Sequence, residues 1–180
     1  MLPERLARKA PCSVLIVPEK SKPEIKNILV GVDFSEHSVN AFEEAMAFAG
    51  AIPGSVIHCL HAFRVPMEYY KTGLSFAQFA ADIEEHAQES YQELVNRFDL
   101  EGLDVRPLFV LDNQPSHAIR QAAKSCQADL IITGARGRSS PAAWVLGSVT
   151  EQLIWNADIP VLAVKRKGAG MSLLRALLSS

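Results

Sequence analysis

Short apolar runs alternate along this chain with longer segments in which apolar residues recur at helical spacing. The clearest run is 28–33, and similar runs lie at 55–63, 103–111, 129–133 and 160–164. Short runs rich in branched residues are typical of buried strands. Because strands that alternate with helices form parallel sheets covered on both faces, we predict an α/β fold with an open, parallel, five-stranded sheet and helices on both faces.

Serine and proline mark the predicted helix starts. Ser35 precedes an amphipathic segment that runs to about residue 49, and Ser75 opens a longer one that runs to about residue 98. A serine at this position accepts a hydrogen bond from a first-turn amide. Further helices are predicted from Pro115, which suits a first turn, to about residue 126, and over 148–156. The segment 64–74 has no clear period and is predicted to be a loop.

Charge and cysteine content exclude several classes of protein. The net charge is −2, so nothing indicates nucleic acid as a partner. Cys12, Cys59 and Cys126 are widely spaced and odd in number, which argues against a zinc site or a disulfide framework. No apolar run is long enough for a membrane span, and residues 1–18 carry charges throughout, unlike a signal peptide. We therefore expect a cytoplasmic protein with one main domain.

The start of the chain resembles its end. Residues 4–18 align without gaps on residues 151–165. The identical pairs are Glu4/Glu151, Leu6/Leu153, Ala10/Ala157, Val14/Val161, Leu15/Leu162 and Val17/Val164. Either any short helix–strand pair matches in this way, or the start of the chain is the remnant of a preceding copy of the same domain.

We prefer the remnant, and it sets the predicted domain organisation. Residues 1–18 are the helix–strand remnant, 19–26 a polar linker, 27–167 the main domain and 168–180 a tail that either docks as a helix or is a loose terminus. Residues 13–17 repeat the final strand, and an apolar sheet edge is a template for pairing. We predict that 13–17 forms a strand against 160–164, in the same chain or in a second copy.

A glycine loop carries the most informative chemistry. Gly134 and Gly137 follow a predicted strand, and after nine intervening residues Gly147 and Ser148 begin a predicted helix. Free amides at a helix start bind phosphate oxygens, and glycine lets the backbone approach them closely. The blander alternative is that these glycines only turn the chain, and that Ser148 and Glu151 only form a capping box.

The whole pattern, Gly-x-x-Gly, nine residues, Gly-Ser, resembles the nucleotide motif of the ATP-binding branch of the universal stress proteins. The segments 28–35 and 158–165 resemble the first and last strands of that family, and the similarity covers about residues 25–167. The resemblance implies a Rossmann-like sheet of the adenine nucleotide alpha hydrolase type. It also implies ATP, or AMP or ADP, as the ligand, with or without Mg²⁺, and a homodimer joined through the final strands.

The resemblance also implies roles for particular residues. Asp33 matches an acid beside the nucleoside, Val32 a neighbour of the base, and Ala62 a position whose backbone reads the adenine edge. The phosphate and ribose loop is matched by Gly134, Gly137, Gly147, Ser148, Val149 and Thr150. Arg136 and Arg138 flank Gly137, and each either touches phosphate or faces solvent.

Three functions remain open at this point. The first is a regulatory ATP-binding protein of the stress response with slow or no hydrolysis. The second is an ATPase or nucleotidyl-transfer enzyme, against which stands the lack of a recognisable general base or metal-binding carboxylates. The third is an interaction module without nucleotide. His58 and His61 lie three apart on one strand, hence on opposite faces, so they cannot share a metal. Trp144 is expected to pack the glycine loop or an interface.

Overall fold

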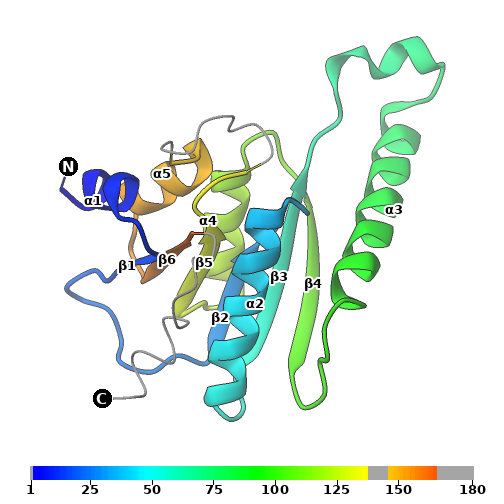
Figure 1. The fold of residues 1–180 in the computed structure, drawn as a ribbon. Helices are drawn as coiled ribbons and strands as arrows, with labels where there is room; N and C mark the ends of the chain where they lie inside the picture. Colours follow the sequence, from blue (N-terminus) through cyan, green and yellow to red (C-terminus); the bar gives the residue numbers. More distant parts are fainter. Residues whose placement is uncertain (1, 138–145, 166–180) are drawn as a thin grey trace.

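The computed structural model describes residues 2–137 and 146–165 (Figure 1). Arg138, Trp144 and the tail 168–180 lie outside the described residues.

A single mixed sheet forms the centre of the fold. Its strands are β1 (Val14–Ile16), β2 (Asn27–Gly31), β3 (Val56–Phe63), β4 (Asp104–Leu111), β5 (Leu130–Gly134) and β6 (Val161–Val164). Their order across the sheet is β1-β6-β5-β2-β3-β4, and β2 to β6 are parallel. The predicted five parallel strands are thus confirmed, and β1 adds a sixth, antiparallel strand.

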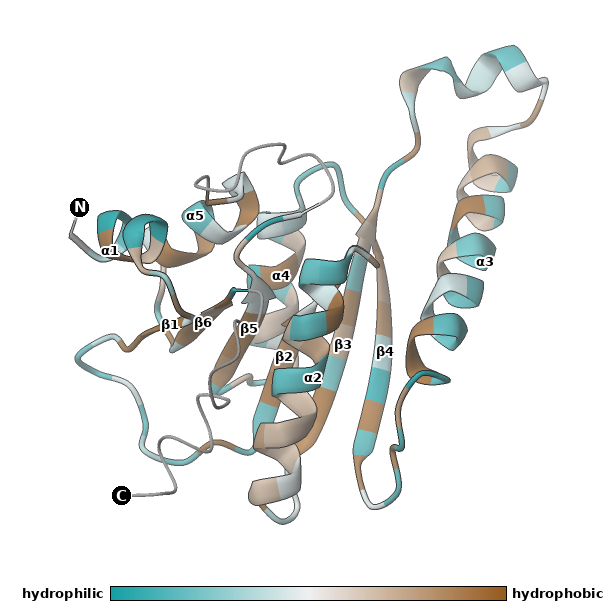
Figure 2. Cartoon of the chain, viewed as in Figure 1, coloured by the Kyte–Doolittle hydropathy of each residue, from teal (hydrophilic) through white to brown (hydrophobic). Residues whose placement is uncertain are grey.

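Helices cover both faces of the sheet, as predicted (Figure 1). The α-helices are α1 (Leu2–Lys9), α2 (Glu36–Ala51), α3 (Phe76–Val95), α4 (Pro115–Ser125) and α5 (Ser148–Trp155). Side chains of α2 and α3 join one core cluster, and those of α1, α4 and α5 join the other. The sheet is therefore the middle layer of three, and Figure 2 shows its central strands as largely hydrophobic.

The predicted serine caps are present at α2 and α3 but not at α5. The Ser35 side chain accepts a hydrogen bond from the Ser38 amide, and Ser75 forms a capping box with Gln78. The capping box expected at Ser148 does not form, because the N-cap of α5 is Gly147, one residue earlier, and no side chain caps the helix. The Ser148 side chain is left exposed beside the cavity described below.

The predicted loop at 64–74 contains a short 3-10 helix, η1 (Met67–Thr72). The Thr72 hydroxyl donates to the Tyr69 carbonyl at 2.6 Å, and Gly73 ends the helix at φ 78°. This left-handed backbone is one that glycine adopts without steric cost. These local hydrogen bonds fix the turn. They do not require regularly spaced apolar residues, so the sequence shows no helical period here.

The predicted strand at 13–17 is confirmed, and its partner lies in the same chain. β1 pairs with β6 antiparallel, with Val14 opposite Ala163, Leu15 opposite Leu162 and Ile16 opposite Val161. β1 thereby occupies the edge that β6 would otherwise expose. At the opposite end of the sheet, β4 is the other edge strand, and it contains Pro107.

Candidate functional site

The carboxyl ends of the central parallel strands open into a cavity of about 550 Å³. This is the position at which ligands bind in open α/β sheets, and the volume lies in the ordinary range for small-molecule sites. The cavity brings together every residue that the sequence assigned to a nucleotide site. These are Val32, Asp33, Ala62, Gly134, Arg136, Gly137, Gly147, Ser148, Val149 and Thr150.

Asp33 is held in place where the chain leaves β2. Its Oδ1 accepts hydrogen bonds from the Ser35 amide at 3.1 Å and from the Ser35 hydroxyl at 2.6 Å. A Cβ on Gly137 would lie 2.8 Å from Asp33 Oδ2. The missing side chain at Gly137 therefore lets the glycine loop pass directly against the carboxylate.

His61 fixes the same turn from the other side. Its Nδ1 lies 2.9 Å from the Val32 carbonyl oxygen, and its ring stacks on Phe34 at a centroid distance of 4.5 Å. Phe34 has φ 60°, a left-handed backbone that costs energy for a residue with a side chain. We conclude that His61 stabilises the strained turn that presents Asp33.

The glycine loop is tied to the sheet by backbone hydrogen bonds. The Ala135 amide donates to the Val164 carbonyl at 2.7 Å, and the Gly147 amide donates to the Ala135 carbonyl at 2.8 Å. The Thr150 hydroxyl donates to the Gly134 carbonyl at 2.8 Å. That hydroxyl therefore holds the loop on α5, and its one hydrogen is used in this bond.

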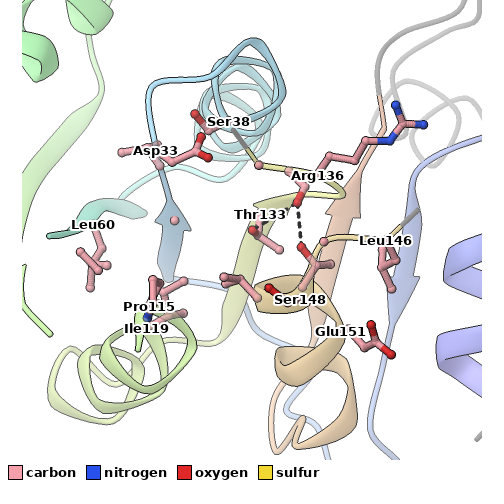
Figure 3. A pocket seen from close by; sticks show the side chains of 18 residues that line it. Asp33, Ser38, Leu60, Pro115, Ile119, Thr133, Arg136, Leu146, Ser148 and Glu151 are labelled. Atoms are coloured by element: carbon pink, nitrogen blue, oxygen red, sulfur yellow. Dashed lines mark hydrogen bonds between the residues drawn. The ribbon is translucent and has the colours of Figure 1, made fainter. Parts of the chain in front are cut away.

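The start of α5 faces the cavity with groups suited to an anion. Ser148, Val149 and Thr150 form its first turn and line the cavity. First-turn amides have no partner within their own helix, and the helix dipole adds positive potential there. The half-buried Arg136 lines the same region, and the acid Glu151 lies in the same first turn, so this wall carries charges of both signs. Figure 3 shows Ser148 and Arg136 across the cavity from Asp33.

Sequence reasoning did not single out several lining residues. Apolar walls come from Leu60, Ile119 and Leu146, and polar ones from Ser38, Thr133 and Glu151. Thr133 was within reach of the sequence, because it lies at the carboxyl end of a predicted strand. Ser38 and Leu146 become neighbours of the cavity only through the packing of α2 and of the loop before α5.

Neither a metal-ligand group nor a membrane-spanning helix occurs among the residues that the structure describes. No group of three or more His, Cys, Asp or Glu side chains is arranged to hold a metal ion among those residues. His58 and His61 face opposite sides of the sheet, as predicted, because the neighbouring Cys59 and Leu60 belong to opposite core clusters. None of the described helices is long and apolar enough to cross a bilayer.

Comparisons with known proteins match this geometry. The chain is 29% identical over 140 residues to a universal stress protein of Thermus aquaticus, covering 78% of this chain and 98% of the relative. The solved structure of hypothetical protein MJ0577, from Methanocaldococcus jannaschii, superposes with a TM-score of 0.68 at 28% identity, covering 80% of this chain and 98% of that one. A universal stress protein solved in complex with cAMP shares the fold, with a TM-score of 0.54 at 21% identity, covering 79% of this chain and 99% of that one.

The family model described as "Universal stress protein family" matches residues 24–165. These residues contain all five parallel strands and every predicted site residue. The chain therefore belongs to the universal stress protein family.

Proposed function

We propose that this chain binds ATP, or the related ADP or AMP, in the cavity at the carboxyl ends of β2, β3 and β5. The observation that carries the proposal is the convergence of the loop after β2, the glycine loop and the first turn of α5 on one cavity. The chemistry of the lining changes from one end of the cavity to the other, as a nucleotide changes from its base and ribose to its phosphates. A carboxylate and apolar walls lie beside β2 and β3, and free amides with an arginine lie at α5.

The proposed pose follows from these differences. Val32 and Ala62 border the base, and the backbone of Ala62 reads the adenine edge. Asp33 accepts a hydrogen bond from a ribose hydroxyl. The phosphates lie against Gly134, Gly137 and the first turn of α5, with Arg136 as a counter-charge. Mg²⁺ would be held mainly by the phosphates, since it usually binds through only one or two carboxylates, and Asp33 is the acid beside the glycine loop.

The cAMP complex supports the choice of an adenine nucleotide, since cAMP is one and that protein has the same fold. The regulatory role in the stress response is proposed from family membership. The protein would bind nucleotide and hydrolyse it slowly or not at all, because a hydrolase needs a positioned general base. The two acids that line the cavity already accept hydrogen bonds, Asp33 from Ser35 and Glu151 from Arg8.

The assembly and the compartment are proposed on separate grounds. The family resemblance implies a homodimer through the final strand, but β1 occupies the free edge of β6 in this chain. We propose that dimerisation through β6 requires β1 to leave. Cys12, Cys59 and Cys126 are free thiols, which suits a reducing compartment such as the cytoplasm.

Titration calorimetry with ATP, with GTP as control, tests the proposal. We expect saturable binding of ATP. Mass spectrometry should also detect an adenine nucleotide among the ligands released from the purified protein. No heat at millimolar ATP would leave the nucleotide-free interaction module as the better account. Phosphate release faster than about one per second, a rate typical of ordinary enzymes, would favour the ATPase alternative.

A further inference from the structure

Glu151 lies where the nucleotide cavity meets the N-terminal segment, residues 2–16. It belongs to the first turn of α5 and lines the cavity. Its Oε1 accepts a hydrogen bond from Arg8 Nη2 of α1 at 3.0 Å, and the same Nη2 donates to Glu4 Oε1 at 3.2 Å. Figure 3 shows its side chain directed away from Ser148, toward the side of the N-terminal segment. An acid in the lining of an anion site is a liability, because it repels phosphate.

Arg8 is positioned by contacts that do not involve Glu151. The neighbouring Ala7 is fully buried against the core cluster that contains Leu153. The Lys165 ammonium, directly after β6, donates to the carbonyls of Arg8 and Ala10 at the end of α1. The Lys165 amide donates to the Ser13 hydroxyl at 3.1 Å. The pairing of β1 with β6 therefore fixes α1, and α1 brings Arg8 to Glu151.

We propose that Arg8 is a positioning residue of the nucleotide site, which pairs with the Glu151 carboxylate and holds it turned away from the phosphates. The inference rests on the proposed function. Without Arg8, the carboxylate is drawn back toward the positive N-terminus of α5, where it competes with phosphate. Because coupling between two equilibria is reciprocal, nucleotide binding also stabilises the docked N-terminal segment.

The decisive measurement is the affinity of Arg8→Gln for ATP, ADP, AMP and adenosine. Arg8 and Glu151 side chains are 44% and 36% exposed, so solvent screens the pair. We expect ATP binding to weaken by about two- to fivefold, the range for a partly exposed ion pair. The loss should shrink from ATP to AMP and vanish for adenosine. Arg5→Gln, the same charge change at an exposed position of α1, is the matched control.

The second measurement uses the partner. In a Glu151→Gln background, Arg8→Gln should leave ATP affinity unchanged, because the carboxylate that lines the cavity is already gone and the remaining partner of Arg8, Glu4, does not line the cavity. Hydrogen exchange at residues 14–16 should slow when ATP is added to the unmodified chain, and this slowing should be smaller in Arg8→Gln.

The outcomes separate the two ideas. Failure of the unmodified chain to bind ATP overturns the proposed function and this inference together. ATP binding that Arg8→Gln and Arg5→Gln weaken equally, or that Arg8→Gln still weakens after Glu151→Gln, overturns only the role of Arg8. Thermal unfolding of each variant, followed by circular dichroism, identifies any loss of affinity that comes from lost structure.

Discussion

Leu15 and Leu162 lie directly opposite each other in the antiparallel pair of β1 and β6. They are also equivalent positions of the repeated sequence, as are Val14 and Val161. Val14 pairs with Ala163 and Ile16 pairs with Val161, so the register is symmetric about the two leucines under the repeat. Such a register is what a two-fold related pair of identical strands would adopt. It strengthens the proposal that the N-terminal segment is the remnant of a preceding domain.

Removal of residues 1–20 should change the oligomeric state. The deletion exposes the apolar β6 edge, which is a template for another strand. We expect the shortened chain to form dimers through β6, detected by light scattering after size exclusion. Deletion of residues 171–180, which leaves β1 in place, serves as the control. If the two deletions give the same mass, β1 does not govern assembly.

Gly147→Val should abolish nucleotide binding and leave the fold intact. A Cβ at this position meets nothing nearer than 3.4 Å, and the backbone has φ −65°, so the backbone here accommodates a residue with a Cβ. The added methyl groups fill the space proposed for phosphate. We expect at least a tenfold loss of ATP affinity, about 1.4 kcal/mol, by calorimetry. Unchanged affinity would show that the glycine has only a structural role.

Gly134→Ala should destabilise the fold itself. Its Cβ would lie 2.8 Å from the His37 carbonyl oxygen and 2.9 Å from the Arg136 carbonyl oxygen. Both are backbone atoms that cannot rotate away, so the loop or α2 must shift. We expect the free energy of unfolding to fall by roughly 1–3 kcal/mol, as for other overpacked sites, measured by urea denaturation. Gly50→Ala, where a Cβ has open space, is the matched control.

His58 should make the protein less stable in mild acid. Burial in β3 lowers its pKa, Arg106 on β4 lowers it further, and Asp104 partly offsets this. Below about pH 6.5, the usual histidine pKa, the unfolded chain therefore binds a proton that the folded chain does not. The free energy of unfolding then decreases as the pH is lowered, until the lowered pKa of the folded state is reached.

We expect the loss of unfolding free energy between about pH 7 and about pH 5 to be smaller in His58→Gln. The exposed His86 serves as the control, through His86→Gln. Equal pH slopes in the unmodified chain and His58→Gln would contradict the prediction.

Most elements of the fold could be predicted because each carries its own local signal. Short branched runs gave the parallel strands, and Ser35 and Ser75 marked helix starts to within a residue. The cap of α5 could not be predicted, because Gly147 is fixed by a bond from its amide to Ala135 across the loop. The short helix η1 could not be predicted either, because it is held by local hydrogen bonds and has no apolar pattern in the sequence.

The candidate site was predictable where it follows strand ends and glycines. Asp33, Ala62 and Gly134 lie within two residues of the carboxyl ends of their strands, both as predicted and in the structure, so their convergence follows from a parallel sheet. The Thr150 hydroxyl holds the glycine loop by a hydrogen bond to the Gly134 carbonyl, sixteen residues earlier in the chain. Such a contact between separate elements could not be predicted from the local sequence. The contact between Arg8 and Glu151 joins residues that are 143 positions apart, so no local sequence pattern predicts it.

Pro107 has a consequence for the opposite edge of the sheet. It lies within β4, the eight-residue outer strand, and a proline has no amide hydrogen to offer a neighbouring strand. Asp104 and Arg106 add a salt bridge on the same short stretch. A fibril grows by adding strands in register to a regular edge, and charges and proline interrupt that regularity. The outer edge of β4 is therefore a poor seed for amyloid.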